Sequence, residues 1–385
     1  MFSDELAKLR SSCLYREILD RGPGGSTSRI LIGGKELISF ASNDYLGLSH
    51  DPRPAEAARM AAEAYGFGAG SSRLLSGGTE LHGQLEEAIA GFKGTEKALC
   101  LNSGYTANVT AIPALAGAGD MIFSDELNHA SIIDGCRLSR AQTVIYRHRE
   151  WEQLSALMKE HQGRKTMVVT DTVFSMDGDI APLREINELC RTHRALFYLD
   201  DAHGTGVLAE GKGALAHAGL QPEPHIIQMG TFSKALGSFG GFIAAEERII
   251  QWLVNTGRGF IYSTALPAPV VAASLKALRI IMDDPSVVKG LWRKRAMLME
   301  GISNLGFETL STESPIIPLV LPEQRENPGD PTVTIAFSRR LRDLGLYAPC
   351  IRPPTVRLPM IRISVTAAHR EEDIRALLQG LSFAK

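Results

Sequence analysis

Apolar and polar positions alternate regularly through the middle of the chain. Short runs such as 121–123 are apolar throughout, which predicts strands that are buried on both faces of a sheet. Most of these runs are separated by segments with helical spacing, such as 106–115, 151–161 and 183–194. Seven strands are expected, at 98–101, 121–123, 143–146, 166–170, 196–199, 226–229 and 241–244. The alternation therefore predicts an α/β domain with helices covering its sheet.

The pattern changes towards both ends of the chain. Residues 1 to about 20 predict an amphipathic helix, and strand-like runs on either side of Gly33 and Gly34 predict a β-hairpin. After about residue 266, long helices are followed by short strand-like pieces and a final helix, which predicts a smaller α+β domain. Three parts are therefore expected: an N-terminal helix and hairpin at 1–44, a large domain at 45–275 and a small C-terminal domain at 276–385.

Composition excludes several classes of function. The chain has 385 residues, of which 44% are hydrophobic and 22% charged, so it can form a substantial core. Its formal net charge of -2 gives no basic surface for nucleic acid. No run of apolar residues is long enough for a signal peptide or a membrane span, so we expect a cytoplasmic protein. The 5 cysteines are scattered without a CxxC pair, which favours neither disulfides nor a metal site.

Lys234 is the first candidate for chemistry. It follows the expected strand 226–229 and the hydroxyl residues Thr231 and Ser233, and small residues come after it. A lysine forms a Schiff base only as the neutral amine, so such a site must lower its pKa by burial or by nearby positive charge. An exposed lysine in a Ser/Gly turn is the alternative.

Polar groups follow two other expected strands. Gly104 and Tyr105 come after the first strand at the start of a helix, where backbone N–H groups and the helix dipole favour an anion such as phosphate. Asp200 ends the buried strand 196–199, and a buried carboxylate needs a cationic partner such as a pyridinium nitrogen. His203 could reach the hydroxyl group of the same ring. A plain turn, a metal site or a loop ion pair are the alternatives.

Two further strand ends complete the set. His129 offers an imidazole that could stack on an aromatic ring, and Ser175 offers a hydroxyl beside acidic turn residues. A structural histidine and an ordinary loop are the alternatives. A phosphate cradle, an acid for a ring nitrogen, an imidazole for the ring face and an amine for an aldehyde together describe a site for pyridoxal phosphate.

Over nearly its whole length the chain resembles the α-oxoamine synthases, a family of fold-type I pyridoxal phosphate enzymes. The motifs that carry the resemblance lie at 42–48, 128–131, 173–179, 200–206, 231–234 and 261–264. It implies a large domain with a mostly parallel seven-stranded sheet covered by helices, and a smaller α+β C-terminal domain. Within the family, 351–356 and 366–369 are most similar to the members of the biotin pathway.

The resemblance also implies a role for each cofactor-binding residue. Lys234 would bind the cofactor aldehyde and act as general base, and Asp200 would pair with the pyridine nitrogen. His203 would contact the ring hydroxyl and His129 would stack on the ring. The phosphate would be held by Gly104, Tyr105 and Thr231, with Ser175 near the ring or the phosphate. The site would form at a homodimer interface, with Ser263 and Thr264 serving the neighbouring subunit.

Five residues are implied to bind substrate: His129, which would also stack on the ring, and Arg16, Asn43, Thr355 and Arg362. Asn43 and Arg362 would hold the substrate carboxylate, since an arginine fork matches a carboxylate. Arg16 and Thr355 would border the acyl substrate. The implied reaction condenses L-alanine with pimeloyl-CoA or pimeloyl-acyl carrier protein, releasing CO2 and thiol and giving 8-amino-7-oxononanoate for biotin biosynthesis.

Three other readings remain open from the sequence. The first is a sister enzyme that uses glycine or serine, namely 2-amino-3-ketobutyrate CoA ligase, 5-aminolevulinate synthase or serine palmitoyltransferase. The tetrapeptide at 352–355 disfavours it, although amino-acid choice depends on only a few pocket contacts. The second is an aminotransferase, which the run at 201–206 disfavours. The third is a non-catalytic regulator, for which we expect no room for a DNA-binding segment before Asn43.

Overall fold

The computed structural model describes residues 2–161, 163–310 and 312–384, which divide into two compact units. Unit 1 combines the residues up to Gly47, the short segment Met176–Asp179 and the residues from Lys289 onwards. Unit 2 consists of Leu48–Ser175 and Ile180–Val288. The expected N-terminal and C-terminal segments thus belong mainly to one unit, and the three-part division stays a prediction.

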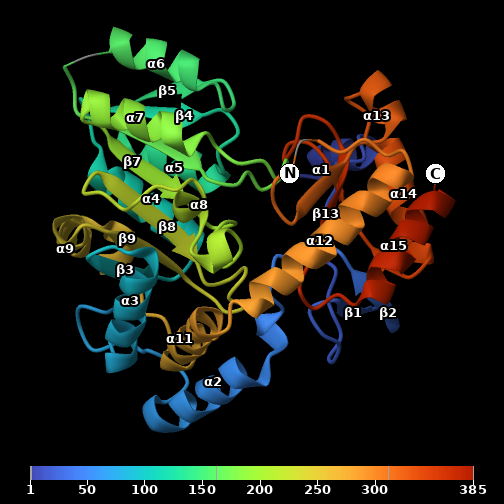
Figure 1. The fold of residues 1–385 in the computed structure, drawn as a ribbon, viewed down its shortest axis with the longest axis horizontal. Helices are drawn as coiled ribbons and strands as arrows, with labels where there is room; N and C mark the ends of the chain where they lie inside the picture. Colours follow the sequence, from blue (N-terminus) through green and yellow to red (C-terminus); the bar gives the residue numbers. More distant parts are fainter. Residues whose placement is uncertain (1, 162, 311, 385) are drawn as a thin grey trace. The chain divides into compact units, whose positions relative to one another are not determined.

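Unit 2 contains the expected seven-stranded sheet, in the order β3-β9-β8-β7-β6-β4-β5 (Figure 1). The strands are β3 (Lys97–Leu101), β4 (Met121–Asp125), β5 (Gln142–Tyr146), β6 (Thr166–Asp171), β7 (Leu196–Asp200), β8 (Ile226–Thr231) and β9 (Gly241–Ala245). The five strands from β8 to β5 run parallel, and β9 is antiparallel to both of its neighbours. Every expected strand is present, so the prediction of a mostly parallel seven-stranded sheet is confirmed.

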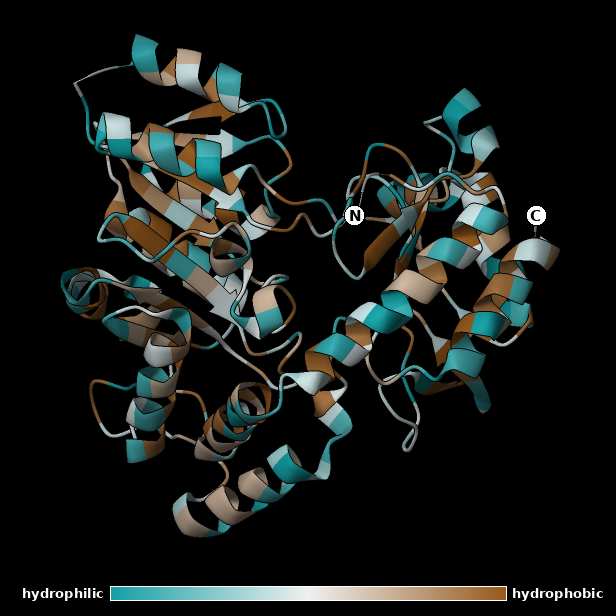
Figure 2. Cartoon of the chain, viewed as in Figure 1, coloured by the Kyte–Doolittle hydropathy of each residue, from teal (hydrophilic) through white to brown (hydrophobic). Residues whose placement is uncertain are grey.

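Helices surround this sheet because its strands are apolar on both faces. The strands of unit 2 are mainly hydrophobic and the helices mix both kinds of residue (Figure 2). Helix α4 (Gly104–Leu115) packs on β8, β9 and α5 (Ala130–Ser139), while α7 (Leu183–His193) packs on β6, β7 and α6 (Trp151–Glu160). The other helices of unit 2 are α2 (Pro52–Tyr65), α3 (Glu80–Lys93), α8 (Ala214–His217), α9 (Glu247–Thr256), α10 (Arg258–Ile261) and α11 (Ala268–Asp283).

The direction of the strands determines where a site can form. Because β4, β6, β7 and β8 are parallel, their carboxyl ends lie along one edge of the sheet. Asp171 ends β6 and is paired in register with Asp200, which ends β7. The connection from β8 to β9 returns at the same edge because these two strands are antiparallel.

Unit 1 contains two three-stranded sheets. One joins β1 (Arg29–Ile32), β2 (Lys35–Ser39) and β11 (Leu346–Tyr347), and the other joins β10 (Ile316–Leu319), β13 (Met360–Ser364) and β12 (Cys350–Ile351). The predicted hairpin is confirmed: Gly33 and Gly34 both have positive φ, at 56° and 78°, as a two-residue primed turn requires. The helices of unit 1 are α1 (Ser3–Ser11), α13 (Pro322–Glu326), α14 (Thr332–Asp343), α15 (Glu371–Ala384) and most of α12 (Ser286–Asn304).

The N-terminal helix is shorter than predicted. It ends at Ser11 because Cys13 takes a left-handed conformation with φ 57°, and the N–H groups of Leu14 and Tyr15 turn back to the carbonyl of Leu9. The side chain of Arg352 then donates to the carbonyl of Tyr15 at 2.5 Å, which holds the chain after the turn. None of the residues of α1 is buried, so the predicted apolar side has no core partner in unit 1.

None of the helices among the described residues has both the length and the apolar character that crossing a membrane requires.

Candidate active site

The first turn of α4 forms an anion cradle beside the sheet. The N-cap residue Ser103 accepts the N–H of the third helical residue, whereas the N–H groups of Gly104 and Tyr105 have no acceptor among the described residues. A Cβ atom on Gly241 would lie 2.7 Å from the carbonyl oxygen of Ser103, and one on Gly104 would lie 3.6 Å from the Cβ atom of Thr231. Gly241 therefore lets β9 lie against the backbone at the start of α4, where two N–H groups are available to an anion such as phosphate.

The side chain of Tyr105 is turned to another partner. Its hydroxyl donates to Asp134, and this hydrogen bond raises the pKa of Tyr105. The predicted contact of Tyr105 with a phosphate is therefore left to its backbone N–H group.

The loop between β8 and β9 fixes the backbone around Lys234. The hydroxyl of Thr231 donates to the carbonyl of Gly240 at 2.7 Å and lies 2.7 Å from the hydroxyl of Ser233. Gly237 donates to the carbonyl of Lys234 at 2.9 Å and needs to be glycine, because its φ is +62° and a Cβ atom would lie 2.2 Å from a backbone nitrogen. The half-buried Lys234 is therefore presented by a closed, rigid turn.

Asp200 and Asp201 are adjacent in the chain but have different partners. Asp201 binds Lys93 at 2.8 Å, and the two side chains are 2% and 0% exposed. The hydroxyl groups of Thr172 and Thr205 also donate to Asp201, at 2.7 and 2.8 Å. The carboxylate of Asp201 is therefore used in a structural ion pair, and of the two aspartates Asp200 is the candidate for binding a ligand.

Asp200 and His129 belong to one hydrogen-bonded chain. The amide nitrogen of Asn108 donates to Oδ2 of Asp200 at 2.7 Å and to Oγ of Ser131 at 2.8 Å. Ser131 Oγ lies 2.7 Å from Nδ1 of His129, and its backbone N–H donates to the same Nδ1 at 3.2 Å. The structure thus joins the end of β7 to the start of α5 through two buried polar side chains of neighbouring helices.

The charges of Asp200 and Lys234 both act on His129. Burial lowers the pKa of His129, the carboxylate of Asp200 opposes this effect, and the charge of Lys234 adds to it. That the three residues meet one cofactor stays a prediction. The lowered pKa keeps His129 neutral near pH 7.

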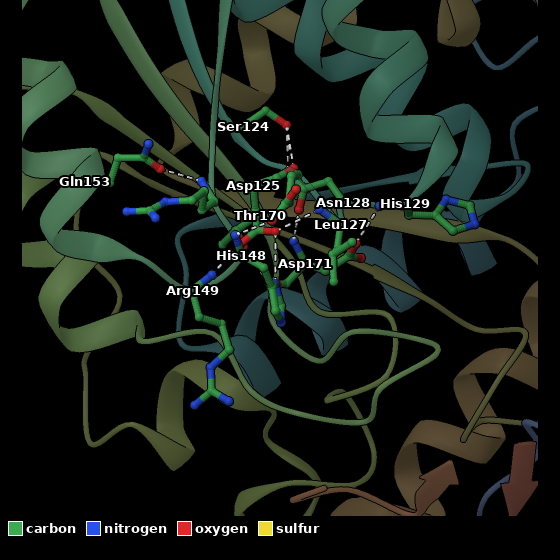
Figure 3. Close-up of polar contacts among 12 residues, drawn as sticks. Ser124, Asp125, Leu127, Asn128, His129, His148, Arg149, Gln153, Thr170 and Asp171 are labelled. Atoms are coloured by element: carbon green, nitrogen blue, oxygen red, sulfur yellow. Dashed lines mark hydrogen bonds and ion pairs between the residues drawn. The ribbon is translucent and has the colours of Figure 1, made fainter. Parts of the chain in front are cut away.

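A second network attaches the loop before α5 to the end of β6 (Figure 3). Asp171 accepts the backbone N–H of His129 at 2.6 Å, and the side-chain oxygen of Asn128 accepts the N–H of Asp171 at 2.8 Å. The amide nitrogen of Asn128 donates to Ser124 and to the carbonyl of Val169, both at 2.9 Å. Asp171 therefore fixes the backbone of His129, a role that the sequence analysis missed.

We expect Asp171→Asn to stabilise the apoprotein more at pH 8 than at pH 5. Burial, and then the charge of Asp200, raise the pKa of Asp171 well above its ordinary value. A carboxyl with a raised folded-state pKa stabilises the fold fully below its unfolded-state pKa, and this contribution is lost as the pH rises. Asparagine keeps an acceptor for His129 without a charge, so the Tm difference between variant and wild type grows with pH. An equal difference at both pH values would contradict the prediction.

The remaining predicted residues of unit 2 lie on loops beside these groups. His203 is buried in a turn in which the N–H groups of Gly204 and Thr205 bond to the carbonyl of Asp201. Ser175 is half-buried, four positions after the end of β6. Asn102, two positions before α4, donates to Ser263 Oγ at 2.6 Å and to the carbonyl of Thr264 at 2.9 Å. Their roles towards a cofactor stay predictions.

Unit 1 brings together four of the five predicted substrate residues in two pairs, and the fifth, His129, belongs to unit 2. Arg362 is buried in β13 and donates to Ser364 at 2.7 Å and to Asn43 at 3.2 Å. Burial raises the pKa of the neighbouring Tyr45 to about 12, an effect that the charge of Arg362 opposes. The second pair, Arg16 and Thr355, is exposed and joined at 3.4 Å.

Comparisons with known proteins identify the family. A model of the family described as aminotransferase class I and II matches residues 35–381, and the chain belongs to this family. A putative 8-amino-7-oxononanoate synthase from Thermodesulfovibrio yellowstonii is 52% identical over 99% of this chain and 97% of its own. The 8-amino-7-oxononanoate synthase from Geobacter metallireducens is 48% identical over 97% and 95%.

A solved structure supports the fold. Serine palmitoyltransferase from S. paucimobilis, in a structure with a bound PLP–myriocin aldimine, matches with a TM-score of 0.91 and 30% identity, over 100% of this chain and 97% of that one. These matches confirm the predicted resemblance to fold-type I pyridoxal phosphate enzymes.

Asn108, Ser131 and Asp171 are the polar residues that the sequence analysis did not assign to the site. The signal for Asn108 was its place between Ala107 and Val109 in a helix that covers a buried sheet, where an uncharged polar side chain needs a buried partner. Asp171 gave a similar signal, because it ends an apolar strand as Asp200 does.

Proposed function

We propose that this enzyme uses pyridoxal phosphate to condense L-alanine with a pimeloyl thioester, giving 8-amino-7-oxononanoate, CO2 and free thiol. The observation that carries the reaction is the identity of 52% and 48%, over nearly complete chains, with proteins named 8-amino-7-oxononanoate synthase. The solved serine palmitoyltransferase is less similar in sequence, at 30%. The enzyme is therefore an acyltransferase, as predicted from the sequence.

The residues of unit 2 fit the cofactor. The glycine-lined start of α4 provides free N–H groups for a phosphate, and Asp200 provides a buried carboxylate for a ring nitrogen. The charges of Lys234 and Asp200 both act on His129, which we propose to stack on the cofactor ring. When bound, pyridoxal phosphate supplies an electron sink for the negative charge that develops at the α-carbon of the substrate.

The chain's own residues then have distinct tasks. Lys234 takes the proton from the α-carbon of the amino acid and later returns a proton to the product, which requires one mobile base. Asp200 holds a proton on the ring nitrogen, because a buried carboxylate favours a cationic partner. The neutral imidazole of His129 covers one face of the ring and excludes water. His203 would contact the ring hydroxyl, and Thr231 with the first turn of α4 would bind the phosphate.

Asn43 and Arg362 are proposed to bind the carboxylate of alanine. The guanidinium group has five N–H donors in a fixed plane, and its contacts with Asn43 and Ser364 orient that plane. Arg16 and Thr355 are proposed to contact the acyl substrate. Their exposure on unit 1 is compatible with a long thioester.

Substitution of Arg362 separates binding from chemistry. We expect Arg362→Ala to raise the KM for alanine by roughly 10²-fold, because a charge-assisted pair with the carboxylate is lost. Arg362→Lys keeps the charge but loses the paired N–H donors of the guanidinium group, so its KM for alanine should lie between those of wild type and Arg362→Ala. Initial-rate kinetics at varied alanine measure this effect. A change in kcat with an unchanged KM would contradict the proposed role.

Oligomeric state and location complete the proposal. We propose a cytoplasmic homodimer in which Ser263 and Thr264 serve the cofactor site of the neighbouring subunit. The link from Asn102 to these two residues holds them beside the start of α4.

A turnover assay tests the reaction. Purified protein loaded with pyridoxal phosphate should release thiol from pimeloyl-CoA only when alanine is present. Parallel reactions with glycine and serine, with other acyl chain lengths and with pimeloyl-acyl carrier protein define the substrates. Thiol release with glycine or serine but not with alanine would reassign the enzyme to a sister activity.

A further inference from the structure

Asn108 is completely buried and uses every polar atom of its side chain. Its two N–H groups bind Asp200 Oδ2 at 2.7 Å and Ser131 Oγ at 2.8 Å, and its oxygen accepts the hydroxyl of Tyr198 at 2.8 Å. The opposite orientation of the amide would bring two acceptor oxygens together at Asp200. The Asn108 amide therefore has only one chemically consistent orientation, with its nitrogen towards Asp200 and Ser131 and its oxygen towards Tyr198.

The same assignment of donors and acceptors extends through Ser131 to His129. Ser131 Oγ accepts a hydrogen from Asn108, so its own hydrogen points to Nδ1 of His129 at 2.7 Å. The backbone N–H of Ser131 also points to this nitrogen. Nδ1 is thus an acceptor, and the ring hydrogen of the neutral imidazole lies on Nε2.

We propose that Asn108 is a positioning residue that couples Asp200 to His129: it orients the carboxylate towards the ring nitrogen and, through Ser131, fixes the tautomer and ring position of the stacking imidazole. This inference rests on the proposed function, which assigns Asp200 and His129 to the cofactor. Protonation of Nδ1 would remove the acceptor of the backbone N–H of Ser131, so this contact favours the neutral imidazole with its hydrogen on Nε2.

Three single substitutions separate the individual hydrogen bonds that connect Asp200 to His129. Asn108→Asp keeps the shape and the acceptor for Tyr198 but replaces both N–H donors with a carboxylate oxygen, which loses the bond to Ser131 and repels Asp200. Ser131→Ala keeps the bond between Asn108 and Asp200 and removes the hydroxyl contacts with Asn108 and with His129, while the backbone N–H contact with Nδ1 stays in place. Tyr198→Phe is the matched control, because it removes one buried hydrogen bond of Asn108 and leaves both of its donor contacts in place.

The readouts are the Kd for pyridoxal phosphate, the visible circular dichroism of the bound cofactor, kcat, and the Tm of the apoprotein. We expect Asn108→Asp to raise the Kd at least about tenfold, since a hydrogen bond to a charged group is lost, and to lower kcat. Ser131→Ala should change the circular dichroism and lower kcat with a smaller change in Kd. Tyr198→Phe should lower the Tm and leave the Kd and the spectrum as in wild type.

A double-mutant cycle gives the decisive measurement. If Asn108 acts on the ring partly through His129, Asn108→Ala should have a smaller effect on kcat in the His129→Ala background than in wild type. Fully multiplicative effects, or a Tyr198→Phe variant that reproduces Asn108→Asp, would overturn the proposal. The Kd and the spectrum do not depend on which substrates are used, so failure of thiol release with alanine would reject the proposed function alone.

Discussion

Lys234→Ala is expected to abolish both turnover and covalent retention of the cofactor. The variant loses the amine that we propose bonds to the cofactor aldehyde and moves the α-proton, so we expect kcat to fall by at least about 10³-fold. Wild-type protein treated with borohydride should keep the cofactor through denaturation, and a peptide map should place it on Lys234. The variant should release it.

Lys97→Ala is a suitable control for this experiment, because Lys97 is an exposed lysine of the same unit, at the start of β3. It should keep wild-type turnover and labelling. Stoichiometric cofactor on another residue of the wild-type protein would show that the closed turn between β8 and β9 does not present the reactive amine.

Asp200→Asn and Asp201→Asn are expected to have opposite consequences, although the two residues are adjacent. Asp200→Asn removes the charge that we propose keeps the ring nitrogen protonated, so kcat should fall by roughly 10²- to 10³-fold, the size of other lost electrostatic contacts in active sites. Among the described residues Asp200 forms no ion pair like that of Asp201 with Lys93, so the Tm should change little.

Asp201→Asn leaves the ammonium of Lys93 buried without its counter-charge. Breaking a buried ion pair by removing one partner typically costs about 3–5 kcal/mol, so the free energy of unfolding should fall while folded enzyme remains active. Kinetics and thermal melting of the two variants, measured side by side, test this assignment. If Asp201→Asn proved to be the inactive variant and Asp200→Asn the unstable one, the site would have been built on the wrong carboxylate.

The strands of the large sheet were predictable because burial on both faces leaves an uninterrupted apolar run for each strand. The glycine pair at 33–34 predicted a hairpin for an equally local reason: a two-residue turn needs positive φ at both positions, which glycine readily adopts and which both residues have in the structure. The N-terminal helix was predicted too long, because its apolar spacing continues past Ser11 while the backbone turns at Cys13. The spacing of apolar residues does not show where the backbone leaves the helix and forms other hydrogen bonds instead.

The sequence by itself determined the fold class and the set of candidate groups, since strand periodicity and the residues at strand ends are local properties of the chain. Only the tertiary structure decided which of the two neighbouring aspartates is paired with a buried lysine, and that Asn108, Ser131 and Asp171 support Asp200 and His129. These contacts join β6, β7, α4 and α5, which are far apart in the sequence. Their partners are set by the order and register of the strands, and a single sequence does not encode that order in any local pattern.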